Sequence, residues 1–245
     1  MNHERVNNVR VSVIVPVHNR AKAELCAEHV RKQTYPNVEL IMVDSKGLPA
    51  EKRNYGYCKS HGSLILFLDD DEYLAPNTIA SCVEKFNEGF DIVGIPLIRV
   101  EPRTYMEKCV WLWETPQTTV PKTTFFKNEV LKSIGTFKEE YTLTDDIDLV
   151  ARALRAGYKI GNIDVKSGYI LHDKNYQLSS VLRKTMLARK PYRVLEGKYI
   201  EVERRSWVET TTKRKRIVKA LLEQPSLIFG VSIAMFSSFF VRRIF

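Results

Sequence analysis

The stretch SLILFLDDDE, residues 63–72, joins a short apolar run directly to four carboxylates. An apolar run of this length that ends in charged residues is typical of a buried strand. The four acids then crowd one strand end, where like charges repel unless a cation is present. Carboxylate oxygens suit Mg²⁺ or Mn²⁺, and these ions bind substrate phosphates as well. The stretch therefore predicts a metal and phosphate site, with a solvated acidic loop as the alternative.

Two further strands are expected upstream, and each ends in a polar cluster. Residues 11–17 (VSVIVPV) are followed by His18 and Asn19, and residues 38–43 (VELIMV) are followed by Asp44. Strands that alternate with helical patterns predict βαβ units and a mainly parallel sheet. Ligands of such sheets bind outside the carboxyl ends of the strands. We therefore expect the three polar clusters to converge on one cleft.

Helical and strand patterns continue along the rest of the chain. The expected helices are residues 22–32, 50–59, 77–87, 144–156, 178–188 and 212–223, and the later strands are 91–98, 158–165 and one that leads to His172. Residues 100–126 have no clear period. Trp111 and Trp113 lie there with an alternate spacing that would put both side chains on one face of a strand, either against a sugar or in the core.

Composition excludes several classes of protein and of site. At 245 residues, 44% apolar and 27% charged, the chain suits one α/β domain with an appendage. Neither a P-loop nor a GxGxxG pattern occurs, so P-loop NTPases and dinucleotide oxidoreductases lose their main support. The four cysteines are scattered without CxxC spacing, which argues against a zinc site and fits a reducing compartment.

The positive charge is concentrated before the C-terminal tail. Residues 182–219 hold 13 Lys or Arg and 4 Asp or Glu, a balance of +9 that equals the net charge of the whole chain. Lys213 to Arg216 are four consecutive basic residues, which a solvated surface would also explain. Residues 224–241 carry no charge and would form a helix of about 27 Å, against a bilayer core of about 30 Å.

This order of basic segment and apolar tail favours an anionic membrane surface over nucleic acid. We expect a catalytic domain over residues 1–175, a basic helical extension over 176–223 and a membrane anchor or interfacial helix over 224–245. The polar start MNHERVNNVR predicts no secretory signal, so the expected location is the cytoplasmic face of the cell membrane. A buried helix of the catalytic domain or a contact with a partner subunit is the alternative for the tail.

Four stretches resemble glycosyltransferase family 2 with its GT-A fold. They are VSVIVPVHNR at 11–20, IMVDSKG at 41–47, EKRNYGYCKSHGSLILFLDDDEYL at 51–74 and TDDIDLVARALRAGYKI at 144–160. Together they span most of residues 10–172. The resemblance implies an α/β fold with a Rossmann-like, mainly parallel sheet flanked by helices. It also implies a nucleotide-diphosphate sugar donor, Mn²⁺ or Mg²⁺, and inverting transfer to a hydroxyl of a glycan or lipid-linked glycan.

The resemblance assigns the donor and metal residues. The family's Pro-x-x-Asn turn, which touches the nucleotide, is filled by Pro16, Val17, His18 and Asn19. Asp44 matches the contact to the base, and Arg53 matches a donor-site arginine. The DxD motif maps onto Asp69 and Asp71, with Asp71 the closer metal ligand, Asp69 a second and Asp70 on the donor side. His172 is a candidate ligand of the metal or the diphosphate, and a structural histidine is the alternative.

The resemblance also assigns the acceptor side. The family's acidic pair maps onto Asp145 and Asp146, with Asp146 as the expected base. Both residues would equally stabilise a helix N-terminus through its dipole, without catalysis. Asp148 and Arg152 are four residues apart, and we expect them to form a surface ion pair.

Two departures from the family pattern bear on function. The second strand continues as Asp44-Ser45-Lys46-Gly47 where the family has Asp-Asp-Gly-Ser, so Lys46 is a candidate to face a phosphate. The Gln-x-x-Arg-Trp motif of processive synthases is absent, which favours addition of a single sugar. Two other functions stay open. One is transfer onto a polyprenyl phosphate, whose oxygen is already anionic, and the other is a membrane-tethered protein that binds nucleotide sugars without catalysis.

Overall fold

The computed structural model describes residues 9–114, 122–140, 145–173, 177–180, 182 and 217–244. The chain divides into two compact units. The first consists of Met1–Arg99 and Val120–Asp173, and the second of Val100–Thr119 and Lys174–Phe245. The first unit thus ends close to residue 175, and residues 100–119 group with the C-terminal segment. The boundaries expected for the three domains remain a prediction.

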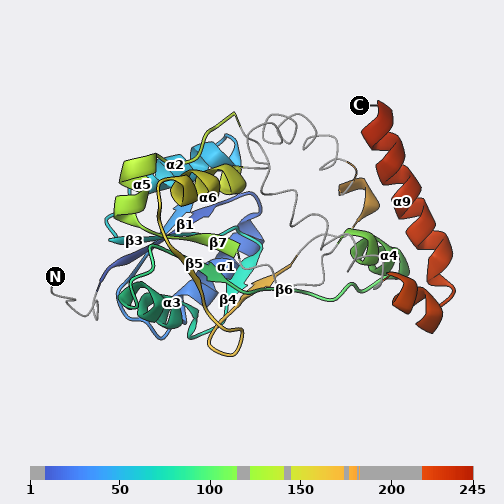
Figure 1. The fold of residues 1–245 in the computed structure, drawn as a ribbon, viewed down its shortest axis with the longest axis horizontal. Coiled ribbons are helices and arrows are strands. Elements are labelled where there is room, and N and C mark those ends of the chain that lie inside the picture. The colour runs from blue at the N-terminus through green and yellow to red at the C-terminus, as the bar shows by residue number, and fades with distance from the viewer. Residues whose placement is uncertain are drawn as a thin grey trace. The chain divides into compact units, whose positions relative to one another are not determined.

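A six-stranded sheet in the order β2-β1-β3-β7-β5-β8 forms the centre of the first unit (Figure 1). Its strands are β1 (Val11–Pro16), β2 (Val38–Val43), β3 (Leu64–Phe67), β5 (Ile92–Ile95), β7 (Lys122–Lys127) and β8 (Ile160–Asn162). Parallel pairs join β1 to β2 and β3, and β5 to β8, whereas β7 runs antiparallel to β3 and β5. The expectation of a mainly parallel sheet is confirmed.

A second sheet of three short strands brings His172 beside the acidic run. Its order is β4 (Glu72–Leu74), β9 (Ile170–His172) and β6 (Leu97–Arg99), and Glu72 pairs directly with His172. The single strand expected over residues 91–98 is therefore wrong, because β5 and β6 belong to different sheets. Pro96 lies between them, and a proline without an amide hydrogen cannot continue a ladder.

Helices cover both faces of the large sheet. They are α1 (Arg20–Arg31), α2 (Pro49–Cys58), α3 (Thr78–Asn87), α5 (Asn128–Ile134) and α6 (Asp145–Arg155). Alternate residues of the strands point to opposite faces, as strand geometry requires. Val13 and Leu66 pack with residues of α1 and α3, whereas Ile14, Ile65 and Phe67 pack with residues of α2, α5 and α6.

The Asp148–Arg152 pair fixes α6 to α5. Arg152 Nε donates to Asp148 Oδ2 at 2.7 Å, and the Asp148 carboxylate is 2% exposed. The same guanidinium donates to the carbonyls of Ile134 and Thr136, at the end of α5. The ion pair forms as expected, but the expectation that it lies on the surface is wrong. Arg152 instead donates to carbonyls at the end of α5 that have no partner within that helix. This contact fixes the helix that begins at Asp145.

The second unit is built on α4 (Tyr105–Glu114) and α9 (Leu227–Ile244), which pack through Cys109, Leu112, Leu227 and Val231. Trp111 and Trp113 are thus on a helix, and the strand face expected from their spacing is wrong. Of the expected C-terminal helices, residues 178–180, 182 and 217–223 are helical, and the remainder lies outside the described residues. Within the described part of the chain, no helix is long and apolar enough to cross a bilayer.

Glu39 generates a prediction about acid stability. Its carboxylate accepts hydrogen bonds from Ser12 Oγ at 2.6 Å and from the backbone and ring of His61 at 3.0 and 2.8 Å. Burial alone would raise the pKa of Glu39, but these hydrogen bonds outweigh burial and lower the pKa from 4.5 to about 2. The stabilisation is therefore present above pH 4.5 and is lost as the pH falls toward 2.

We expect Glu39→Gln to lower the free energy of unfolding at neutral pH by about 1.5–3 kcal/mol, the usual contribution of hydrogen bonds to a charged group. Urea denaturation of both proteins across the acid range measures the difference, which should shrink as the pH falls. Glu28→Gln, on the exposed side of α1, is the control. A difference that does not change with pH would contradict the role of the charge.

Candidate active site

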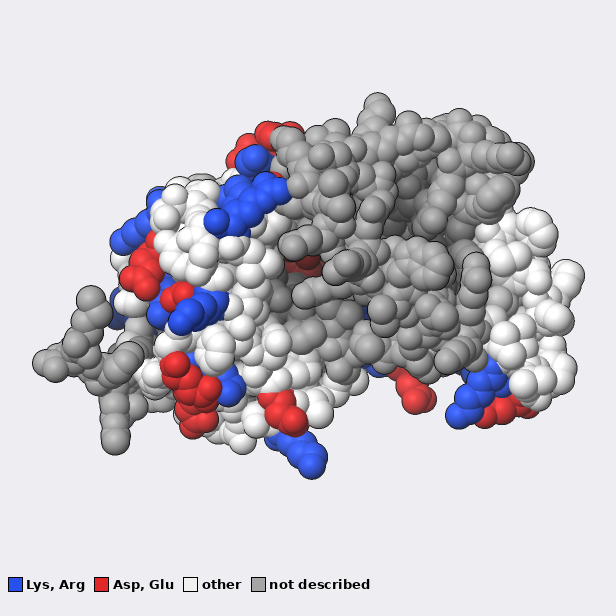
Figure 2. All heavy atoms as spheres, viewed as in Figure 1, with Lys and Arg blue, Asp and Glu red and all other residues white. Residues whose placement is uncertain are grey.

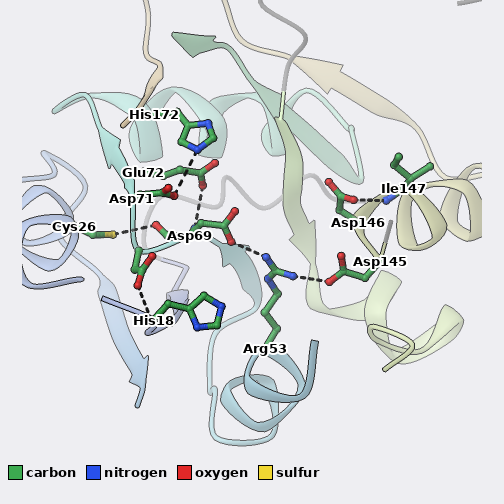
Figure 3. Close-up of polar contacts among 11 residues, drawn as sticks. His18, Cys26, Arg53, Asp69, Asp71, Glu72, Asp145, Asp146, Ile147 and His172 are labelled. Carbon is green, nitrogen blue, oxygen red and sulfur yellow. Dashed lines mark hydrogen bonds and ion pairs between the residues drawn. The ribbon is translucent and has the colours of Figure 1, made fainter. Parts of the chain in front are cut away.

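His18, which follows β1, and the acids that follow β3 meet where the parallel strands end (Figure 3). Pro16, the last residue of β1, pairs with Val43, the last residue of β2, and Ile14 pairs with Phe67, the last residue of β3. The segments that follow these strands are joined by hydrogen bonds. His18 donates its amide to Asp70, and Arg20 Nη1 donates to Asp44 Oδ2 at 2.8 Å. The convergence expected from the strand order is present in the structure.

Arg53 joins the acidic run to the start of α6. Its Nη2 donates to Asp69 Oδ1 at 2.6 Å and its Nη1 donates to Asp145 Oδ2 at 2.5 Å, so the guanidinium lies between two carboxylates (Figure 3). The ring of Phe137 lies 5.2 Å from the guanidinium carbon. Burial would lower the pKa of Arg53, but the two carboxylates outweigh burial and raise it. The side chain is therefore a permanent cation between the two carboxylate sites.

Asp70 holds the turn that follows β1. Its carboxylate is buried, and Oδ2 accepts the amides of His18 and Asn19 at 2.5 and 2.6 Å. The side chain of Asn19 in turn accepts the amide of Lys22 at 3.1 Å and caps α1. Asp70, the second acid of the run, therefore binds the turn, and it fixes the backbone that ends at Asn19.

Lys52 holds the same turn from α2. Its side chain is buried, and Nζ donates to the Val17 carbonyl at 2.6 Å and lies 3.5 Å from His18 Nδ1. Because an ammonium has no lone pair, Lys52 can only donate in this contact. Sequence analysis did not single out Lys52. A lysine next to Arg53 on a helix has the pattern of a solvent-facing residue, and nothing in the sequence distinguishes it.

Asp71 and His172 form the pair that a divalent ion would fit. His172 Nε2 lies 3.5 Å from Asp71 Oδ1, and two donor atoms at this separation can share an ion about 2 Å from each. Burial works to raise the pKa of Asp71, but the hydrogen bond and charge of His172 outweigh it and lower the pKa. Glu72, by contrast, accepts the amide of Asp69 at 3.0 Å. Lys22 pairs with Asp173, the residue after His172, at 2.8 Å.

No three His, Cys, Asp or Glu side chains of the described residues converge on a point where they could hold a metal. Asp69, expected as a second ligand, has its Oδ1 on Arg53 instead. His172 Nδ1 is buried and has no hydrogen-bond partner within the described residues. The protein therefore offers Asp71 and His172, and phosphate oxygens and water would complete the coordination of Mg²⁺ or Mn²⁺.

The two acids that begin α6 differ in exposure. Asp145 is 6% exposed and faces Arg53, and its burial raises its pKa while the charge of Arg53 works against that rise. Asp146 is exposed, and its Oδ1 accepts the amide of Ile147 at 2.8 Å. Of the pair, Asp146 is therefore the one that an acceptor can reach.

An open hollow of about 570 Å³ lies beside the end of β2. Its polar lining includes Asp44, Lys46 and Glu51, and the ring of Tyr55 is 56% exposed there. Gly47 closes the turn beside it with a φ of +136°, which an L side chain rarely adopts. A flat exposed ring next to a carboxylate is suited to a nucleobase, which offers a π face and N–H donors.

Lys52 generates a prediction for this site. We expect Lys52→Met to weaken nucleotide binding about tenfold or more, because the loss of a hydrogen bond from a charged group amounts to about 1.5–3 kcal/mol. Calorimetry with UDP and GDP measures the affinity, and Lys32→Met on the exposed side of α1 is the control. Unchanged affinity in a variant that unfolds at lower temperature would limit Lys52 to a structural role.

Known proteins share a domain, part of the sequence or the fold with this chain. Residues 45–133 match a model of the glycosyl transferase family 2 domain. The chain is 28% identical to glycosyltransferase GlyG of Streptococcus pneumoniae serotype 4, over 32% of this chain and 35% of that protein. It is also 28% identical to the minor teichoic acid biosynthesis protein GgaB of Bacillus subtilis, over 56% of this chain and 16% of that protein. The chain thus spans about a third of GlyG and a sixth of GgaB.

Solved structures share the fold at lower identity. TarS 1–349 of S. aureus in complex with UDP-GlcNAc superposes with a TM-score of 0.52 at 18% identity, over 74% of this chain and 65% of that one. The mannosyltransferase PcManGT of Pyrobaculum calidifontis, in complex with GDP-Man and Mn²⁺, has a TM-score of 0.56 at 16% identity, over 94% and 74%. These similarities show a shared α/β fold with a mainly parallel sheet.

Proposed function

We propose that this chain, which belongs to glycosyltransferase family 2, transfers a sugar from a nucleotide-diphosphate sugar to an acceptor hydroxyl with inversion at the anomeric carbon. The observation that carries the proposal is the Arg53 bridge between Asp69 and Asp145. In this proposal Asp69 would lie on the donor side of this fixed cation and Asp145 on the acceptor side. Nucleotide sugars in the TarS and PcManGT complexes support a donor of this class.

The donor nucleotide would lie on the turn from Pro16 to Asn19 and in the hollow beside Asp44. The turn is held by Asp70 and Lys52, so its backbone is organised before the donor arrives. Asp44 would accept an N–H of the base, and Tyr55 would stack on it. Lys46 lines the same hollow, where its charge would favour the phosphates.

Asp71 and His172 would hold Mn²⁺ or Mg²⁺ together with phosphate oxygens of the donor. When bound, the ion supplies positive charge beside the departing diphosphate. The Mn²⁺ in the PcManGT complex supports an ion in this fold. Asp69 would act through Arg53, because its carboxylate orients the Arg53 guanidinium.

Asp146 would be the general base. The acceptor hydroxyl gives its proton to the Asp146 carboxylate, its oxygen bonds to the anomeric carbon, and the nucleoside diphosphate leaves from the opposite face, which inverts the configuration. Exposure of Asp146 at the start of α6 supports this role, and Asp145 is committed to Arg53.

The acceptor we propose is a glycan or a lipid-linked glycan at the cytoplasmic face of the cell membrane. The similarity to the minor teichoic acid biosynthesis protein GgaB supports this class of acceptor, and four cysteines without a disulfide fit a reducing compartment. The alternatives are a polyprenyl phosphate acceptor, which needs no base, and a nucleotide-sugar binding protein without catalysis. Hydrolysis of a UDP- or GDP-sugar in the presence of Mn²⁺ distinguishes an enzyme from a binding protein.

Asp71→Asn should abolish the dependence of donor binding on a divalent ion, because the remaining ligand is a single neutral histidine. Calorimetry with UDP-GlcNAc and GDP-mannose, with and without Mn²⁺, measures this dependence. Glu84→Gln, an exposed acid on α3, is the control. If the variant binds donor as tightly as the wild type in Mn²⁺, the ion does not bind at Asp71.

Asp146→Asn should leave donor binding unchanged and slow transfer by about 10²–10⁴, the usual contribution of a general base. Its stability should be unchanged because the side chain is exposed. Asp145→Asn should instead lower the melting temperature, because it removes half of the charge that balances buried Arg53. If neither change slows turnover, the base assignment fails and the polyprenyl phosphate acceptor becomes the better explanation.

A further inference from the structure

Helix α9 has one face that is fixed by packing within the second unit. Leu227, Val231 and Ala234 recur at the spacing of one helical face and are buried. They pack with the buried residues of α4, including Cys109. Gly230 allows this approach, because a Cβ there would lie 2.5 Å from the Cys109 sulfur. This face of α9 is therefore not available to another partner.

The opposite face of α9 is also apolar, and it is exposed. Phe229 and Phe236 are 72% and 66% exposed, and they lie seven residues apart on one side of the helix. Ile228 and Met235 have the same spacing and are 59% and 39% exposed. Where the side chains of α9 are described, the helix presents uncharged atoms (Figure 2). We call these four residues the outer face of α9.

The helical residues just before α9 also expose apolar side chains. Val218 and Leu222 lie one turn apart and are 56% and 78% exposed. Large apolar side chains exposed together on one helix face often mark a site that binds a partner or a membrane. The outer face of α9 is therefore suited to a binding partner other than α4.

Charge decides which partner fits. Residues 182–219 carry +9, which equals the net charge of the whole chain, and Lys219 is exposed between Val218 and Leu222. A second copy of the chain would carry the same positive charge, and like charges repel. Nucleic acid would match the charge, and its bases could stack on the phenylalanines, but it would not cover the aliphatic side chains of Ile228 and Met235. An anionic lipid surface matches both, with headgroups for the basic residues and acyl chains for the aromatic rings.

We propose that the outer face of α9 lies in the interfacial layer of an anionic membrane, with the helix axis in the plane of the bilayer. The helix lies flat because its other face is committed to α4 and cannot be surrounded by lipid. This docking does not depend on the proposed sugar transfer, and it would hold the enzyme where lipid-linked acceptors are.

The test uses the full chain and sedimentation with vesicles of phosphatidylcholine, with and without phosphatidylglycerol. The wild type should bind vesicles that contain phosphatidylglycerol, and added salt should weaken the binding. Phe229→Ser combined with Phe236→Ser should bind at least about tenfold more weakly, because each phenylalanine loses its burial in lipid. Leu25→Ser combined with Val165→Ser removes two exposed apolar residues from the first unit and should bind like the wild type.

Several outcomes would overturn the proposal. In the first, the double phenylalanine variant binds vesicles as tightly as the wild type. In the second, the wild type binds equally to vesicles with and without phosphatidylglycerol. In the third, the wild type binds neither kind of vesicle. A change in oligomeric state on sedimentation velocity, with lipid binding unchanged, would make the outer face a subunit interface instead. Circular dichroism checks that the variant is folded, and Ile228→Ser repeats the test at a single site of the outer face. Donor hydrolysis without vesicles should be unchanged in the double phenylalanine variant and in the single-site variant. This result separates a failure of docking from a failure of the proposed catalysis.

Discussion

The guanidinium of Arg53 is enclosed between Asp69 and Asp145, over the ring of Phe137. A buried charge is tolerated when its partners supply both the opposite charge and the hydrogen bonds, and removing one partner is strongly destabilising. This requirement ties α2, the end of β3 and the start of α6 to one another. The positions of the acids on both sides of the site follow from the balance of this one cation.

The four adjacent acids that follow β3 have four different roles. Asp69 faces Arg53, Asp70 accepts two amides of the turn after β1, and Glu72 accepts the amide of Asp69. Their mutual repulsion is therefore relieved largely by donors of the protein itself, rather than by a single shared metal ion as the sequence suggested. Asp71, next to His172, is the acid of the run that we propose as the ligand of a divalent ion.

The expectations that failed share a physical cause. The strand over residues 91–98 is divided at Pro96, and each half is completed by a partner strand that lies far away in the sequence. Residues 105–114 lack the clear hydrophobic period of a surface helix. Their helix packs against α9, which lies more than a hundred residues further along the chain. The pair of Asp148 and Arg152 has the spacing of a surface pair, and its burial depends on the end of α5. Local pattern contains no information about these distant partners.

The sequence by itself determined the alternation of strands and helices, the mainly parallel sheet and the polar clusters at its carboxyl edge, because hydrophobic period and strand ends are local properties. The four matched stretches also carried the resemblance to glycosyltransferase family 2, which the match of residues 45–133 to that family's domain model supports. Only the tertiary structure decided which acid faces which donor, that Lys52 is buried beneath the turn, and that Asp145 is committed to Arg53 while Asp146 stays exposed. These facts depend on distances between residues as far apart as Arg53 and Asp145, and electrostatic interactions act through space rather than along the chain.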